Sequence, residues 1–166
     1  MRVAIVMGST SDLPKLEPAI DILKSYGVAV DVRCLSAHRA HAGLSAFIEE
    51  ANSNGTEVFI AAAGMAAALP GVIAAMTPLP VIGLPINSTL DGVDALLSIV
   101  QMPPGISVAT VGINNGMNAA VMAVQILALG DEALAKRFAD YRATLSEKIV
   151  KANDDLKNVK YKFKVD

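Results

Sequence analysis

The chain has 166 residues and a net charge of −2 at pH 7, with 53% hydrophobic and 18% charged residues. This charge balance excludes the basic surface that binds nucleic acid or anionic lipid. One cysteine excludes a disulfide framework within the chain. The length fits a single domain over residues 1–166, built around one substantial core.

Apolar strand-like runs alternate with helix-like segments along most of the chain. Strands are predicted at residues 2–8, 28–36, 57–64, 79–85 and 106–113. Helices are predicted at residues 12–27, 40–55, 69–77, 91–101 and 118–130. This alternation predicts an α/β fold: a doubly wound parallel sheet of about five strands in a three-layer αβα sandwich.

The last segment, residues 131–166, differs in character from the rest. It is charged and amphipathic, and it ends in the basic, aromatic run "KNVKYKFKVD". The pattern predicts a C-terminal helical extension on the surface, followed by a basic tail.

Residues 58–90 carry no charge and are numerous enough to span a bilayer. Proline and glycine divide the run into strand-length and short-helix pieces, and the chain has no tryptophan for an aromatic belt. We therefore expect no membrane span, and we expect the surplus apolar surface to lie between subunits of a homo-oligomer. The N-terminus enters a strand without a signal-peptide layout, so the expected location is the cytoplasm.

Ligands of doubly wound sheets bind beyond the carboxyl ends of the strands. Residues 8–12, 36–39 and 64–71 follow the first three strands, so they are the main candidates for a site. "PINSTLDG" and "INNGMNAA" complete the rim after the fourth and fifth strands.

"MGSTSD" follows the first strand and opens a helix. Its hydroxyls and free amides suit an anion such as phosphate, although the segment is neither a Walker loop nor GxGxxG. The alternative is that Ser11 or Asp12 simply caps the helix.

"CLSAHRAH" contains both histidines and the only cysteine. Arg39 suits a phosphate, and His38 can move protons near neutral pH. No carboxylate or second ligand pair accompanies the histidines, so no metal site is expected. Cys34 is predicted to pack inside the strand as a small hydrophobe, and His41 to face solvent on the next helix.

"AAAGMAAALPG" joins a glycine turn to a run of alanines. Small side chains let the backbone approach a flat ligand, and successive amides can hold a carboxylate or CO2. Tight helix packing at a subunit interface explains the same composition equally well.

Taken in order, "GSTSD", "SAHR", "ALPG" and "SIVQMPPG" resemble the 5-(carboxyamino)imidazole ribonucleotide mutase family of purine biosynthesis. The resemblance covers residues 2 to about 130. It implies a flavodoxin-like fold, a homo-octamer, and transfer of a carboxylate from the exocyclic nitrogen to the adjacent ring carbon. No ATP, metal or organic cofactor is implied.

The resemblance also implies roles for individual residues. Ser9 and Asp12 would contact the ribose phosphate, Arg39 would bind its phosphate, and His38 would be the catalytic histidine. The alanine-rich loop would hold CO2 between its release and its return to the ring. The other candidates for substrate binding are Ser11, Ser36, Gly64, Met65, Ala66, Ala68 and Leu69.

The chain departs from the family pattern at the third-strand loop and after "SAHR". Many members have a Gly-Gly pair and a histidine where this chain has Gly64-Met65 and Ala68. Thr-Pro commonly follows "SAHR", whereas this chain has Ala40 and His41.

Two alternative functions remain open. A related carboxylase, which uses free CO2 and aminoimidazole ribonucleotide, generally has "SAHK" and "GRSN", and neither motif is present here. A flavin-binding or phosphoacceptor module would share the fold, but aromatic residues make up only 4% of the chain and the acids of a receiver are missing.

Overall fold

A computed structural model describes residues 1–157 and 159, and its centre is one parallel β-sheet. The strand order is β2-β1-β3-β4-β5. The strands are β1 (Arg2–Met7), β2 (Ala29–Cys34), β3 (Val58–Gly64), β4 (Val81–Ile86) and β5 (Ala109–Thr110). From the neighbouring strands β1 and β3, the chain adds β2 on one side and β4 and β5 on the other, as in a doubly wound sheet. The predicted fold class is therefore confirmed.

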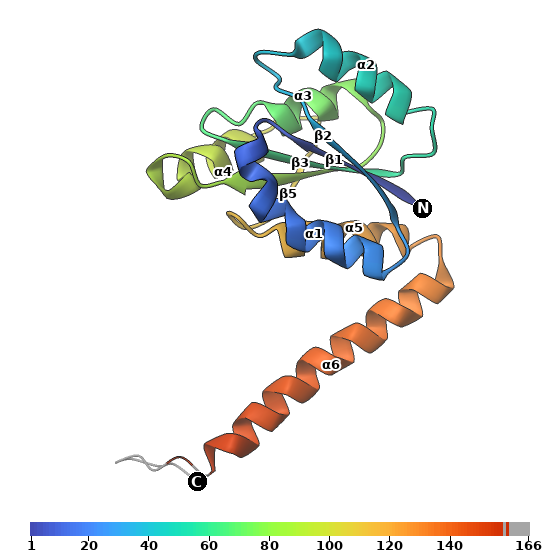
Figure 1. Cartoon of the computed structure of the whole chain (residues 1–166), viewed down its shortest axis with the longest axis vertical. Coiled ribbons are helices and arrows are strands. Elements are labelled where there is room, and N and C mark those ends of the chain that lie inside the picture. Colours follow the sequence, from blue (N-terminus) through green and yellow to red (C-terminus); the bar gives the residue numbers. More distant parts are fainter. Residues whose placement is uncertain (158, 160–166) are drawn as a thin grey trace.

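Helices cover both faces of the sheet (Figure 1). The bounds are α1 (Leu13–Ser25), α2 (His41–Ala51), α3 (Leu69–Met76), α4 (Val93–Val100), α5 (Gly116–Leu127) and α6 (Glu132–Leu156). Short 3-10 turns, η1 (Thr10–Asp12) and η2 (Leu90–Gly92), precede α1 and α4. Helices α1 and α5 pack on one face, and α2, α3 and α4 pack on the other.

The side chains of β1 alternate between the two faces of the sheet, so this strand packs against both helix layers. Val3 and Ile5 point toward α1 and α5, whereas Ala4 and Val6 point toward α2 and α3. Successive strand residues face opposite sides, so a strand covered on both faces must be apolar throughout. This requirement explains the continuous apolar runs in the sequence.

The two edge strands differ from the predictions. Cys34 lies in β2 as expected but is exposed, which corrects the prediction that it packs as a buried side chain. The reason is that β2 has a neighbour on only one side. The other edge strand, β5, has only two residues instead of the predicted run 106–113, and it pairs with β4 only at Ile82 and Gly83.

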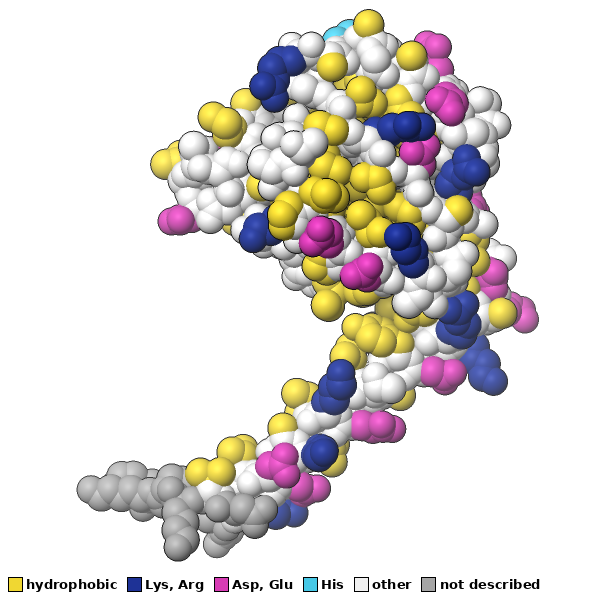
Figure 2. Space-filling view, in the orientation of Figure 1, with side chains coloured by type: hydrophobic (Ala, Val, Ile, Leu, Met, Phe, Trp, Pro, Cys, Tyr) yellow, Lys and Arg dark blue, Asp and Glu magenta, His cyan; other side chains and the backbone are white. Residues whose placement is uncertain are grey.

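Helix α6 begins on the body and then leaves it (Figure 1). Leu134 is buried, and the Arg137 guanidinium donates hydrogen bonds of 2.8 and 3.1 Å to the carbonyls of Ser25 and Tyr26. Figure 2 shows hydrophobic side chains along the projecting part, where Leu145 and Ile149 are exposed. The helical extension is thus present, while most of the predicted basic tail (158 and 160–166) lies outside the described residues.

No helix in the described part of the chain is both long enough and apolar enough to cross a membrane. The uncharged run 58–90 instead forms β3, α3, β4 and the loops between them, with its proline and glycine residues at or near the breaks.

Candidate active site

A cavity of about 530 Å³ lies at the carboxyl ends of the central strands. The loops after β1, β2, β3 and β4 form its walls. The structure brings all the site residues proposed from the sequence to this one cavity: Ser9, Ser11, Asp12, Ser36, His38, Arg39, Gly64, Met65, Ala66, Ala68 and Leu69.

The loop after β1 is shaped by serine hydrogen bonds. Ser9 Oγ accepts from the amide of Ser11 at 3.3 Å and from the Ser11 hydroxyl at 2.8 Å. Ser9 therefore caps the turn η1, while Asp12 stands at the start of α1 without a capping hydrogen bond from its side chain. Asp12 therefore occupies the N-cap position of α1, as one alternative predicted, but its side chain makes no capping hydrogen bond there. Ser11 lies inside η1 and is not a cap residue.

Asp12 is a carboxylate held at the cavity wall with only 7% of its surface exposed. Burial raises the pKa of the Asp12 carboxyl above its ordinary value, and hydrogen bonding to Ser9 and Ser11 partly opposes the rise. A buried acceptor without a capping role is available for hydroxyl groups of a ligand.

The loop after β2 presents His38 and Arg39 at the surface of the cavity. The amide of Arg39 donates to Ser36 Oγ at 3.3 Å, and the amide of Ala40 donates to the Ser36 carbonyl at 2.9 Å. Ser36 thus holds the turn from which both side chains extend. Within the described residues the Arg39 guanidinium has no carboxylate at ion-pair distance, so it is free to bind an anion.

His41 is the first residue of α2 and is exposed, as predicted. It does not line the cavity. The two histidines are therefore separated by the turn and the helix start, and only His38 reaches the site.

The loop after β3 provides a narrow apolar wall. Its side chains from Ala66 to Ala68 are methyl groups, and the amide of Ala67 donates to the carbonyl of Gly64 at 3.1 Å. The amides of Ala66 and Ala68 have no backbone acceptor in the described residues. They are donors available to a carboxylate or CO2 beside the start of α3.

Ser88 was not predicted, although it also lines the cavity. It follows β4, whose neighbour in the sheet is β3, so its loop lies beside the alanine-rich loop. The strand-end rule selected its segment, but no motif distinguished this serine from Asn87 or Thr89. Gly8, Ala37 and Ala67 also line the cavity; they lie in the predicted segments but were not singled out as binding residues. Ala63 lines it from outside those segments.

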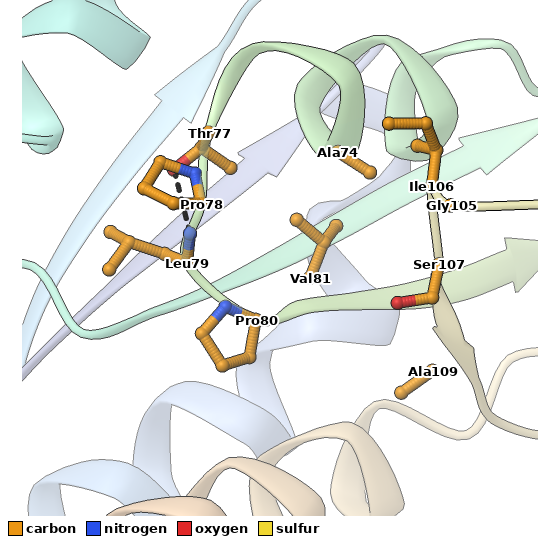
Figure 3. Close-up of a pocket in the computed structure, with 10 residues that line it drawn as sticks. All are labelled: Ala74, Thr77, Pro78, Leu79, Pro80, Val81, Gly105, Ile106, Ser107 and Ala109. Atoms are coloured by element: carbon orange, nitrogen blue, oxygen red, sulfur yellow. Dashed lines mark hydrogen bonds between the residues drawn. The ribbon is translucent and has the colours of Figure 1, made fainter.

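A second cavity, of about 410 Å³, lies at the amino ends of β4 and β5. Figure 3 shows the residues that line it. Pro78, Pro80 and Val81 line it at the start of β4, and Ile106 and Ser107 border it just before β5. None of the described residues that line it has an ionisable side chain, so acid–base chemistry and phosphate binding are better suited to the first cavity.

A doubly wound sheet with hydroxyls, an arginine and a buried carboxylate at its carboxyl edge defines an α/β protein suited to small phosphorylated ligands. The family model described as AIR carboxylase matches residues 2–148. The chain belongs to this family.

Similar proteins carry two kinds of name. An N5-carboxyaminoimidazole ribonucleotide mutase of Methanocaldococcus jannaschii is 50% identical over 158 residues, which are 95% of this chain and 98% of that protein. A phosphoribosylaminoimidazole carboxylase of Saccharomyces cerevisiae is 47% identical over 96% of this chain, which spans only 28% of the yeast protein. The crystal structure of Treponema denticola PurE matches with a TM-score of 0.86 and 30% identity, covering 95% of this chain and 99% of that one.

Proposed function

We propose that this chain is an isomerase that converts 5-(carboxyamino)imidazole ribonucleotide to 4-carboxy-5-aminoimidazole ribonucleotide in purine biosynthesis. Relatives named as mutases match the chain over 82% to 98% of their length, with identities of 43% to 50%. The single observation that carries the proposal is the meeting of Asp12, His38, Arg39 and the alanine-rich loop at one cavity.

Binding is assigned to the charged and hydroxyl groups of the first two loops. Arg39 pairs with the phosphate, because its planar guanidinium matches phosphate oxygens and has no carboxylate at ion-pair distance among the described residues. Ser9, Ser11 and Ser36 supply further hydroxyls around the ligand. Asp12 accepts hydrogen bonds from ribose hydroxyls, and its carboxylate form is the stronger acceptor.

The chemistry is assigned to His38 and the alanine-rich loop. Cleavage of the carbamate C–N bond leaves the electron pair on nitrogen, which takes up a proton, and CO2 is released. The adjacent ring carbon then attacks CO2, and loss of the ring proton restores aromaticity. His38 is the group at the cavity suited to give the first proton and accept the second. The loop holds CO2 in place, which makes its return effectively intramolecular.

The alternative is a carboxylase that takes up dissolved CO2. It is favoured by relatives named phosphoribosylaminoimidazole carboxylase, which are 44% to 47% identical over their matching part. Supplying each substrate separately while varying bicarbonate distinguishes the two. A mutase converts the carboxyamino substrate at a rate independent of bicarbonate. Product formed only from aminoimidazole ribonucleotide plus CO2 would overturn the mutase proposal.

We also propose that residues 1–166 form one domain and that the protein works as a cytoplasmic homo-octamer. The exposed side chains of Leu145 and Ile149 on α6, and of Val93 and Leu97 on α4, support association of copies. Light scattering of the purified protein tests the assembly. A monomer mass at micromolar concentration would contradict it.

A further inference from the structure

Met65 occupies a backbone conformation that a methionine rarely adopts. It follows β3 in a turn closed by the hydrogen bond from the Ala67 amide to the Gly64 carbonyl. Its φ is +57°, while Ala66, the second central residue, is not among those with positive φ. A turn with positive φ at its first central residue usually has glycine there. A long side chain at this position therefore needs an explanation.

The side chain of Met65 is also the only long one in its loop. Residues 64–68 are otherwise one glycine and three alanines. Met65 lines the cavity but remains 58% exposed, so it is not held in the core. An unbranched apolar chain in this place is free to lie across a ligand.

The strand order places Met65 across the cavity loops from the catalytic candidate. His38 comes from the loop after β2 and Met65 from the loop after β3, and β1 with its serine loop lies between these strands. The cavity is therefore bordered by a proton-carrying and phosphate-binding wall on one side and by an apolar wall on the other. Met65 is the one adjustable group of the apolar wall.

We propose that Met65 is a specificity-determining side chain that closes the cavity over CO2 and so favours internal transfer over exchange with dissolved CO2. This inference rests on the proposed function. Released CO2 is small and carries no net charge, so an ion pair cannot hold it and amide donors alone hold it weakly. A side chain that excludes water and blocks the exit can retain it, and a thioether chain does so without competing for hydrogen bonds.

The reaction makes leakage measurable. Between the two half-reactions the enzyme holds aminoimidazole ribonucleotide, CO2 and one transferred proton. If CO2 escapes, aminoimidazole ribonucleotide accumulates, or the ring carbon takes CO2 from the medium. Unlabelled substrate in 13C-bicarbonate buffer with carbonic anhydrase therefore gives labelled product through leakage from the enzyme, beyond the background set by spontaneous loss of the carbamate in solution.

The experiment compares the parent protein with Met65→Ala, Met65→Gly and Met65→Leu. We expect the alanine and glycine variants to incorporate at least about five times as much label as the parent. The leucine variant should incorporate as little label as the parent, because leucine keeps an apolar side chain of similar size. An enzyme-free reaction corrects for spontaneous loss of the carbamate. Thermal unfolding separates the effect of backbone strain from the effect of losing the side chain, because glycine relieves the strain of the positive φ and alanine does not.

Equal label incorporation in the parent, alanine and glycine variants would overturn the role of Met65. Failure of the parent itself to convert the carboxyamino substrate would instead overturn the proposed function. The two failures are therefore distinguished by the parent reaction alone.

Discussion

Gly64 and Ser88 lie so close together that a Cβ atom on Gly64 would stand 2.6 Å from Oγ of Ser88. The same atom would lie 3.1 Å from the carbonyl oxygen of Ile86, which is the partner of Gly64 in the pairing of β3 with β4. Glycine is thus required at the end of β3, where the loops after β3 and β4 begin side by side at the cavity. The shape of the cavity at this corner depends on the absence of one methyl group.

Gly64→Ala should lower both activity and stability, the latter by about 1–3 kcal/mol, because Ser88 and the strand end must move. In a Ser88→Ala background the loss should be smaller, since the 2.6 Å contact is gone while the contact with Ile86 remains. Urea unfolding and steady-state kinetics of the four proteins measure the coupling. Gly112→Ala is the control, since its nearest contact would be an ordinary 3.7 Å. Additive effects would show that the two residues do not constrain each other.

His38→Asn should reduce turnover by about 10²–10⁴-fold while substrate binding and assembly are retained, because the side chain carries protons and is exposed rather than buried in the core. His41→Asn is the matched control, since this exposed histidine does not line the cavity. Rapid-quench single-turnover kinetics with both variants measure the chemical step. Near-normal turnover by His38→Asn would remove the histidine from the mechanism.

Arg39→Ala should raise KM by about 10- to 100-fold through loss of a charge-assisted contact with phosphate. The rate on bound substrate should change much less. Arg33→Ala provides the control, because Arg33 pairs with Asp31 at 3.1 Å and lies outside the cavity. Equal losses in KM and in the single-turnover rate would mean that Arg39 does more than bind phosphate.

Asp12→Asn should stabilise the free protein at neutral pH and weaken substrate binding. The pKa of Asp12 is raised in the folded state above the ordinary 3.8, so the folded state binds this proton more tightly than the unfolded state. The parent consequently loses stability as pH rises from 3.8 through the folded-state pKa of Asp12, and above that pKa the cost is constant. The asparagine variant has no titrating group at this position, so its stability lacks this dependence on pH.

Urea unfolding of both proteins between pH 3 and 8 tests this sign. The advantage of the asparagine variant should be largest at neutral pH and should shrink as pH falls toward 3.8. Asp21→Asn, which removes an exposed charge from the adjoining helix α1, should show no comparable gain. A parent that is more stable than Asp12→Asn at neutral pH would mean that the carboxylate has a stabilising partner.

Much of the fold followed from the sequence because burial on both faces imposes apolar runs on the central strands. The runs at Val3–Val6 and Phe59–Ala63 have this property, and both are buried strands. The same rule failed at the edges of the sheet. Cys34 continues an apolar pattern but is exposed, because its strand has one neighbour, and this depends on strand order rather than on local composition.

The site could be predicted in outline because the carboxyl ends of parallel strands meet at one end of the sheet. This rule placed Asp12 and His38 together although they come from different loops. Details that depend on atomic packing were not predictable. Ser88 was missed because its approach to Gly64 requires the pairing of β3 with β4, and the positive φ of Met65 is not encoded in a recognisable turn motif.

The exposure of Cys34 makes the protein unusually simple to follow by spectroscopy. It is the only thiol in the chain, and Ser36, which lines the cavity, is only two residues further along. A single maleimide dye would therefore attach at one defined point beside the β2 loop, without engineered cysteines. Its fluorescence would report occupancy of the cavity directly, and the binding step could be timed separately from the chemistry.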